Sequence, residues 1–247
     1  MTGVDGKRVI DGRPETLRRT LDEALQRLRA EVIDLYYLHR WDKAVPIEDS
    51  IGAMADFVKA GKVRALGLSE VSATTLRKAH AVHPIAAVQN EYSPWSRNVE
   101  LGILETSREL GTALVCFSPV GRGFLAGSAQ SHDSLAGSDI RRGMPRFQPE
   151  NLGRNMELYR QFARIAADAQ CTPAQLSLAW VLSRGDHVIA IPGTTQIEHL
   201  EENFAALDIR IDADVLARVD QLFAPGAAAG PRYPAGTLAE IDTEEFA

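Results

Sequence analysis

The sequence is poor in cysteine, in positive charge and in long apolar runs, and each shortage excludes a class of protein. Only two cysteines, Cys116 and Cys171, occur in 247 residues, so no disulfide framework is expected and we predict a cytoplasmic location. With 27 Lys and Arg against 33 Asp and Glu, the chain lacks the basic excess that is typical of nucleic-acid binding. No apolar run approaches the roughly 18 residues of a membrane span, and residues 1–8 lack the apolar core of a signal peptide. We therefore expect neither nucleic acid nor a membrane as a partner.

Short apolar runs alternate with amphipathic segments along most of the chain. Five runs predict strands, at residues 32–38, 63–68, 85–88, 113–117 and 188–191. Helical spacing of apolar residues predicts helices near 14–28, 51–58, 99–110, 158–169, 196–206 and 212–222, and Ser72 and Thr172 are expected to cap two more. Strands joined through helices must be parallel. The fold class is therefore α/β, and periodicity alone does not separate a barrel from a doubly wound sheet. The length suits either one barrel of about 250 residues or two average domains.

Two stretches depart from this alternation. Residues 121–150 are rich in glycine and charge and predict a long loop after the fourth strand. Residues 224–247 are rich in Gly, Ala and Pro and predict an irregular tail. Since no shift in composition marks the boundary of a second domain, we treat 1–247 as a single domain.

Polar or glycine residues follow every predicted strand. The carboxyl ends of parallel strands meet at one edge, where α/β proteins bind ligands, so we expect one polar site there. His39 is the only histidine at a strand end and is a candidate hydrogen-bond donor or acid–base group facing a substrate. The alternative is a loop histidine with a structural or solvated role.

Two segments at these strand ends are candidate anion sites. Gly121-Arg122-Gly123 can offer backbone amides to a phosphate, although it is neither a P-loop nor a complete dinucleotide fingerprint. Thr194-Thr195 is expected to open a helix, where free amides and the helix dipole favour an anion; plain capping is the alternative. The histidines and cysteines lack metal-ligand spacing, and we predict no metal site.

Five ordered segments carry a resemblance to a known family. They are residues 33–40, 61–70, 88–93, 117–125 and 191–203. Together they resemble the aldo-keto reductases, and the similarity extends from about residue 12 to Tyr233. Glu70 and the segments 79–84 and 230–233 resemble the branch that contains pyridoxal reductase and perakine reductase.

The resemblance implies a (β/α)8 barrel that reduces an aldehyde or ketone with a nicotinamide cofactor. It implies a catalytic role for His39, which would orient and polarise the carbonyl of a small substrate. The cofactor-binding residues that it implies are Ser69 and Gln89 at the carboxamide, Phe117 on the nicotinamide ring, Ser118, Gly121 and Arg122 at the pyrophosphate, Gly193, Thr194, Thr195 and His199 near the 2′-phosphate, and Glu202 and Asn203 at the adenine. NADP(H) is the expected cofactor, with NAD(H) as the alternative because Thr195 stands where the branch carries lysine or arginine.

The resemblance also implies an N-terminally truncated barrel with about five parallel strands. The family's first three βα units, with the aspartate, tyrosine and lysine of its catalytic set, have no matching positions, and we expect the open strand edges to promote self-association. An inactive nucleotide-binding or regulatory protein, or a non-functional fragment, is therefore the alternative to an active reductase. Substrate identity is left open, with Trp41, Trp95 and the 121–150 loop expected near the mouth of the site.

Overall fold

Helices alternate with parallel strands in the computed structural model, which describes residues 9–129 and 131–246. The strands are β1 (Ile33–Leu38), β2 (Val63–Ser69), β3 (Ile85–Glu91), β4 (Ala113–Phe117) and β5 (Val188–Ile191). The α-helices are α1 (Pro14–Leu28), α2 (Ile47–Lys59), α3 (Ala73–Val82), α4 (Ile103–Leu110), α5 (Pro149–Asp168), α6 (Pro173–Leu182), α7 (Ile197–Ala205), α8 (Ala213–Leu222) and α9 (Ala235–Glu240). Residues 1–8, Gln130 and Ala247 lie outside the described residues. They include the segment on which the signal-peptide prediction rests, and one residue each of the expected loop and tail.

The strands follow one another in chain order in one five-stranded sheet, and the β1–β2 and β2–β3 ladders are parallel. This confirms the predicted α/β class with its five parallel strands. The chain divides into two compact units. The first contains β1, β2, α1–α4 and Ala239–Glu244, and the second contains Glu91–Leu101 and Val115–Leu238. That the fold is an incomplete barrel stays a prediction.

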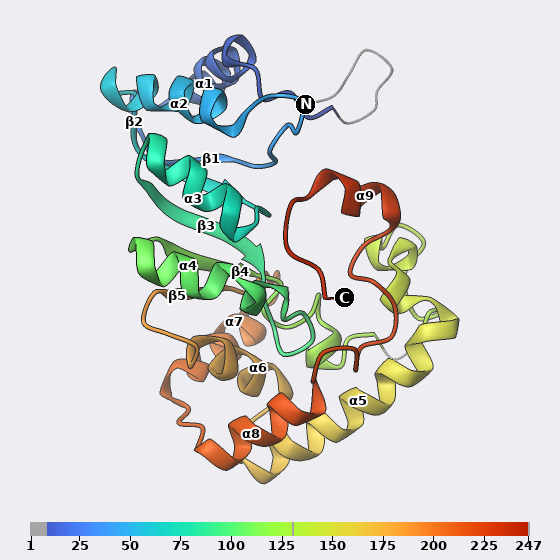
Figure 1. Ribbon diagram of the computed structural model, residues 1–247. Coiled ribbons are helices and arrows are strands. Elements are labelled where there is room, and N and C mark those ends of the chain that lie inside the picture. The colour runs from blue at the N-terminus through green and yellow to red at the C-terminus, as the bar shows by residue number, and fades with distance from the viewer. Residues whose placement is uncertain (1–8, 130, 247) are drawn as a thin grey trace. The chain divides into compact units, whose positions relative to one another are not determined.

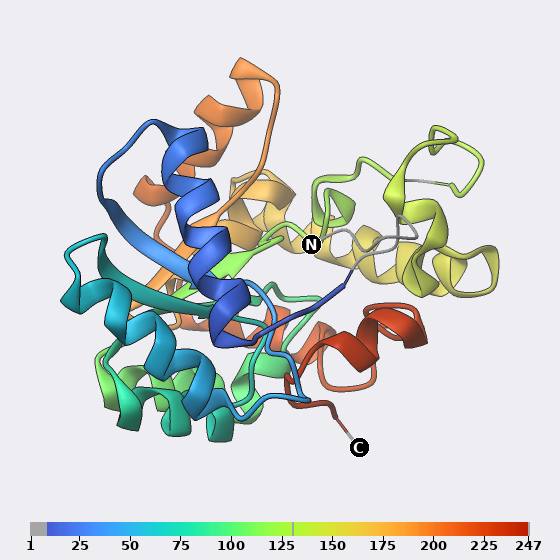
Figure 2. The ribbon, with the colours of Figure 1, turned by 90° about the horizontal axis from the view of Figure 1, so that it is seen from above.

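The first unit is built from helices that pack in a row beside its strands. Neighbours contact one another from α1 to α4, and Figures 1 and 2 both show α2, α3 and α4 side by side. Leu17, Leu21 and Ala24 form the buried stripe of α1, at the spacing that predicted this helix. Gly111 ends α4 with a φ of +67°, a conformation that favours glycine.

The core of the second unit gathers around Trp180 of α6. This indole is fully buried, packs edge-on against Tyr92 with 5.3 Å between ring centroids, and donates a 3.0 Å hydrogen bond to Asp220. Phe162 of α5 and Phe223 after α8 meet at 5.4 Å, which joins these two helices. Burial of such aromatic side chains supplies much of the stability of a core.

The segment predicted as a long loop, 121–150, has more structure than expected. It contains the 3-10 helices η2 (Phe124–Ala126), η3 (Ile140–Gly143) and η4 (Pro145–Phe147), and α5 begins at Pro149 rather than near 158. Glycine and asparagine lower helix propensity in the first turns of α5. Leu152 and Met156 are nevertheless buried there, so tertiary packing outweighs local propensity.

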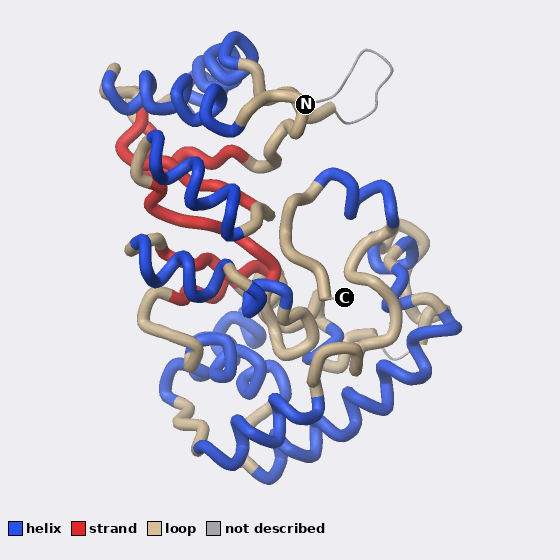
Figure 3. The backbone as a smooth tube through the Cα atoms, viewed as in Figure 1, coloured by secondary structure: helices blue, strands red, loops and turns tan. Residues whose placement is uncertain are grey.

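The tail after residue 224 is also not merely irregular. It forms α9, and Figure 3 shows the loop that continues from this helix to the C-terminus. Lys43 donates hydrogen bonds to the carbonyls of Ala239 (3.1 Å) and Ile241 (2.7 Å), and Ile241 is buried. Composition misled the prediction because these contacts join residues almost 200 positions apart.

Asp242 in this tail completes the N-terminal cap of α3. Ser72 is the N-cap residue, as predicted, and its hydroxyl accepts from the Thr75 amide. The Asp242 carboxylate accepts from the Ser72 amide (3.1 Å), the Ser72 hydroxyl (2.8 Å) and the Thr75 hydroxyl (2.6 Å). A carboxylate at this position also interacts favourably with the helix dipole.

Asp242→Ala should therefore destabilise the protein. We expect the free energy of unfolding to fall by about 2–3 kcal/mol, because three polar groups lose a charged acceptor. Urea denaturation measures the change, with the exposed Asp208→Ala as the matched control. An unchanged denaturation midpoint for Asp242→Ala would show that the tail contributes nothing to α3.

An apolar face is exposed on the last predicted βα unit. Ile197, Leu200, Phe204 and Leu207 follow one another at helical spacing on α7 and the turn after it, and each is at least 54% exposed. Ile189 and Ile191 of β5, the strand at one end of the sheet order, are also exposed. Apolar surface of this kind favours association; self-association of this chain stays a prediction.

Within residues 9–129 and 131–246, no helix has the length and apolar character to cross a membrane.

Candidate functional site

A cavity of about 880 Å³ lies in the second unit. Its walls come from the segment after β4, the loop around η3, the start of α6, and the segment between β5 and α7. The residues predicted for cofactor binding that line it are Ser118, Arg122, Gly193, Thr194, Thr195, His199, Glu202 and Asn203. The volume lies within the range of small-molecule sites, so one cavity collects residues from two distant parts of the sequence.

The segment after β4 is a tight turn with an unusual backbone. Ser118, Gly121, Arg122 and Gly123 have φ values of +50°, +58°, +57° and +82°. The amides of Gly121 and Gly123 donate to the carbonyls of Ser118 (2.8 Å) and Val120 (3.1 Å). Within the described part of the chain, the amides of Val120 and Arg122 donate no hydrogen bond. Both amides are therefore free donors, and Val120 and Arg122 both line the cavity.

The second wall of the cavity includes the N-terminus of α7. Thr194 and Thr195 do not open this helix as expected, because the N-cap is Gln196 and the Thr194 hydroxyl accepts from the Gln196 amide at 3.1 Å. No described side chain caps the helix. Its first amides lack intrahelical acceptors, and the helix dipole makes this end partly positive. The helix therefore begins two residues later than predicted, and an anion site at this end stays a prediction.

The residues at the ends of β2 and β3 form a hydrogen-bonded group in the first unit. The Ser69 hydroxyl donates to the Gln89 carbonyl at 3.0 Å and accepts from Arg40 at 3.3 Å. Gln89 is half-buried, and its side chain hydrogen-bonds the hydroxyl of Tyr37. The structure thus brings the predicted pair Ser69 and Gln89 together.

Tyr37 is a site residue that the sequence did not single out. Its register partner on β2 is Gly67, where even a Cβ would overlap the tyrosine ring. Burial raises the pKa of the Tyr37 hydroxyl, while its hydrogen bond with Gln89 opposes the shift. The Tyr37 side chain therefore lies against both Gly67 and Gln89.

His39 follows β1 and is exposed. It lines a small cavity of about 150 Å³ together with Tyr37, Arg40 and Met54. Phe117, at the end of β4, is half-buried, and its carbonyl accepts from the Tyr92 amide at 3.3 Å.

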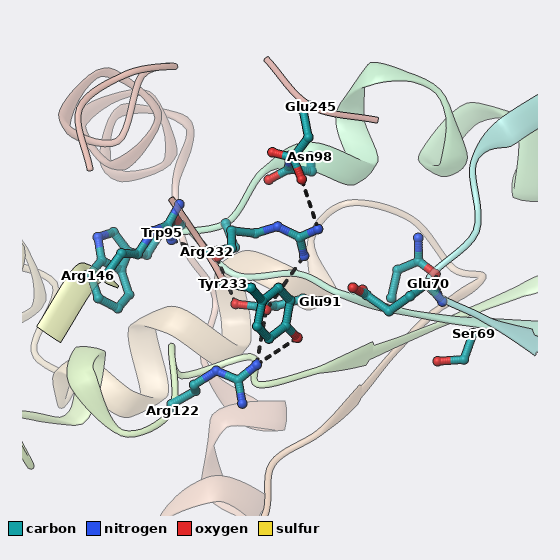
Figure 4. A network of polar contacts seen from close by, with 12 residues as sticks. Ser69, Glu70, Glu91, Trp95, Asn98, Arg122, Arg146, Arg232, Tyr233 and Glu245 are labelled. Carbon is teal, nitrogen blue, oxygen red and sulfur yellow. Dashed lines mark hydrogen bonds and ion pairs between the residues drawn. The ribbon is translucent and has the colours of Figure 1, made fainter. Parts of the chain in front are cut away.

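A buried charge cluster in the second unit escaped the sequence predictions. Glu91 is 5% exposed; its carboxylate lies 3.3 Å from the Arg122 guanidinium and 3.6 Å from that of Arg232, and it accepts from the Ser96 hydroxyl at 2.9 Å (Figure 4). Burial alone would raise the pKa of Glu91, but Arg232, Arg122 and Arg146 together hold it below its usual value. In the sequence, the only indication of this cluster is that the Glu91 carboxylate directly follows an apolar strand. The arginines that pair with it cannot be identified from the sequence.

Arg146 is a further, half-buried cation of this cluster. Burial lowers its pKa to about 10. Its guanidinium donates to the Trp95 carbonyl (2.6 Å), the Ser96 hydroxyl (2.9 Å) and the Gly230 carbonyl (3.2 Å), and it stacks over the Trp95 ring.

Among the described residues, no group of histidine, cysteine, aspartate and glutamate side chains could hold a metal ion.

The sequence profile described as the aldo/keto reductase family matches residues 3–224. The chain belongs to this family. It is 42% identical over 239 residues, 96% of its own length and 70% of the relative's, to the aldo-keto reductase yakc [NADP(+)] of Schizosaccharomyces pombe. The predicted family is therefore confirmed, whereas the branch and the truncation stay predictions.

Two solved structures of similar fold agree with this family assignment. One is the thermostable aldo-keto reductase Tm1743 in complex with the inhibitor epalrestat, with a TM-score of 0.67, 29% identity, and coverage of 85% of this chain and 67% of that one. The other is the glycerol dehydrogenase AKR11B4 from Gluconobacter oxydans, with a TM-score of 0.79, 26% identity, and coverage of 87% and 65%. The chain thus spans about two thirds of the length of these relatives.

Proposed function

We propose that the chain binds NADP(H) through the cavity of its second unit and reduces the carbonyl group of a small aldehyde or ketone. The observation that carries this proposal is the meeting of two anion-binding elements in one cavity, the 118–123 turn and the N-terminus of α7. The yakc relative, whose name specifies NADP(+), supports the choice of cofactor.

The donors around this cavity fit a dinucleotide. The free amides of Val120 and Arg122 and the Arg122 guanidinium suit the pyrophosphate. Thr195 and the first amides of α7 suit a 2′-phosphate, with His199 as a further donor. Glu202 and Asn203, on the next turn of α7, offer polar groups to the adenine.

For the reacting end of the cofactor, the residue roles are those that the family resemblance implies. NADPH supplies a hydride when bound. Ser69 and Gln89 would bind the carboxamide, and Phe117 would stack on the ring. His39 would donate a hydrogen bond to the substrate oxygen, which polarises the carbonyl toward hydride attack.

The experiment combines a binding titration with an assay of turnover. NADPH is titrated into the purified protein and followed by its fluorescence, and consumption of NADPH is then measured with an aromatic aldehyde. We expect saturable binding and turnover, and His39→Ala should lower kcat at least about tenfold while the NADPH affinity stays within about twofold. Absence of NADPH binding would refute both the reductase and a nucleotide-binding role.

The second candidate is a protein that binds the nucleotide without turnover. It is favoured because the predicted residues that line the cavity are cofactor-binding residues and not catalytic ones. In that case NADPH binds but no aldehyde is reduced. Turnover that His39→Ala leaves unchanged would refute the role of His39 and keep the cofactor assignment.

A further inference from the structure

We infer that Glu91, Arg232 and Tyr233 are positioning residues that fix Arg122 and thereby hold the 118–123 turn in its anion-binding shape. The inference rests on the proposed function, since that function makes this turn a pyrophosphate site. None of the three residues lines the cavity itself, so each would act through Arg122.

Arg122 needs external support because its backbone is unfavourable. It has a φ of +57° and lies between two glycines that also have positive φ. A residue with a Cβ rarely adopts this conformation, which persists when surrounding contacts determine it. The Arg122 amide donates no hydrogen bond within the described residues, and the backbone conformation sets its direction.

The supporting contacts come from remote parts of the second unit. The Arg122 guanidinium donates to the Tyr233 hydroxyl at 2.8 Å and lies 5.2 Å from the centre of its ring. The same nitrogen lies 3.3 Å from the Glu91 carboxylate. Arg141 donates to the Arg122 carbonyl at 3.1 Å, so both the side chain and the backbone of Arg122 are held.

The two anchors are themselves immobilised. Glu91 and Tyr233 are almost completely buried. Arg232, with a side chain 2% exposed, lies 3.6 Å from the Glu91 carboxylate and 3.3 Å from Glu245, as Figure 4 shows. A guanidinium held by fixed partners needs no reordering when an anion arrives, and such preorganisation strengthens binding.

Tyr233→Phe is the sharpest variant because it keeps the buried ring and removes only the hydroxyl that accepts from Arg122. Tyr159→Phe is the matched control: it removes a phenolic hydroxyl from the same unit, and that hydroxyl has no hydrogen bond in the described residues. Fluorescence titration gives the NADPH affinity of each variant. Hydrogen exchange of the 118–127 amides, without cofactor, reports on the turn itself.

We expect Tyr233→Phe to weaken NADPH binding about tenfold and to accelerate exchange in 118–127, while Tyr159→Phe changes neither. Wild-type affinity or unchanged exchange in Tyr233→Phe overturns the inference and leaves the proposed function standing. If the wild-type protein does not bind NADPH, the proposed function fails. Exchange then decides the positioning role alone, since faster exchange supports it and unchanged exchange overturns it.

Discussion

Glu91→Ala should lower the free energy of unfolding by about 3–5 kcal/mol, the range for removing one partner of a buried ion pair. The variant leaves Arg122 and the buried Arg232 without their shared carboxylate. Arg146, whose pKa is lowered by burial, also loses the negative charge of Glu91 that opposes this shift. Urea denaturation measures the loss, with the exposed Glu201→Ala as control.

The pH dependence gives an independent check of this ion cluster. Because the pKa of Glu91 is held below its usual value, its ion pairs contribute stability above the unfolded pKa of about 4.3, and this contribution disappears as the pH falls through the folded pKa. The wild type should therefore lose more stability than Glu91→Ala on acidification. A loss below about 1 kcal/mol at neutral pH, with parallel pH profiles, would show that the three arginines do not depend on Glu91.

Thr195→Glu should weaken NADPH binding by about 10–100-fold. Thr195 is exposed at the cavity, two residues before the first turn of α7, and a carboxylate there repels a 2′-phosphate at the helix end that would attract it. Thr195→Arg should strengthen NADPH binding about tenfold through a charged hydrogen bond. NADH has no 2′-phosphate, so its affinity should change no more than about twofold in either variant.

Thr195→Gln separates the effect of charge from that of size. It adds a longer neutral side chain and should leave the ratio of NADPH to NADH affinity near the wild-type value. Equal changes for NADPH and NADH in the charged variants would place the 2′-phosphate away from α7. Fluorescence titration of both nucleotides against the wild type and the three variants gives the eight affinities.

Local features of the fold could be predicted because they depend on neighbouring residues. The helix caps at Ser72 and Thr172, the latter a complete capping box with Gln175, follow from side chains three positions apart. Alternation of strands and helices placed the strand ends, and with them Ser69 and Gln89. Of the residues that the family resemblance implied between Ser118 and Asn203, all but Gly121 line one cavity.

The features that sequence reasoning missed depend on contacts between distant positions. Glu91 meets Arg232 across 141 positions of the chain, and Asp242 caps α3 from 170 positions beyond Ser72. Periodicity describes which face of an element is buried and carries no information on which remote charge it meets. The early start of α5 has the same origin, because burial of Leu152 outweighed weak local propensity.

Hydrogen exchange with and without NADPH locates the bound cofactor. NADPH is expected to slow exchange of amides in 118–123 and in 195–199, two segments that line the cavity of the second unit. No protection is expected in 161–165 and 218–222, which line a separate cavity of about 470 Å³. Protection confined to the latter segments, or no protection at saturating NADPH, would contradict the assignment of this cavity to the cofactor.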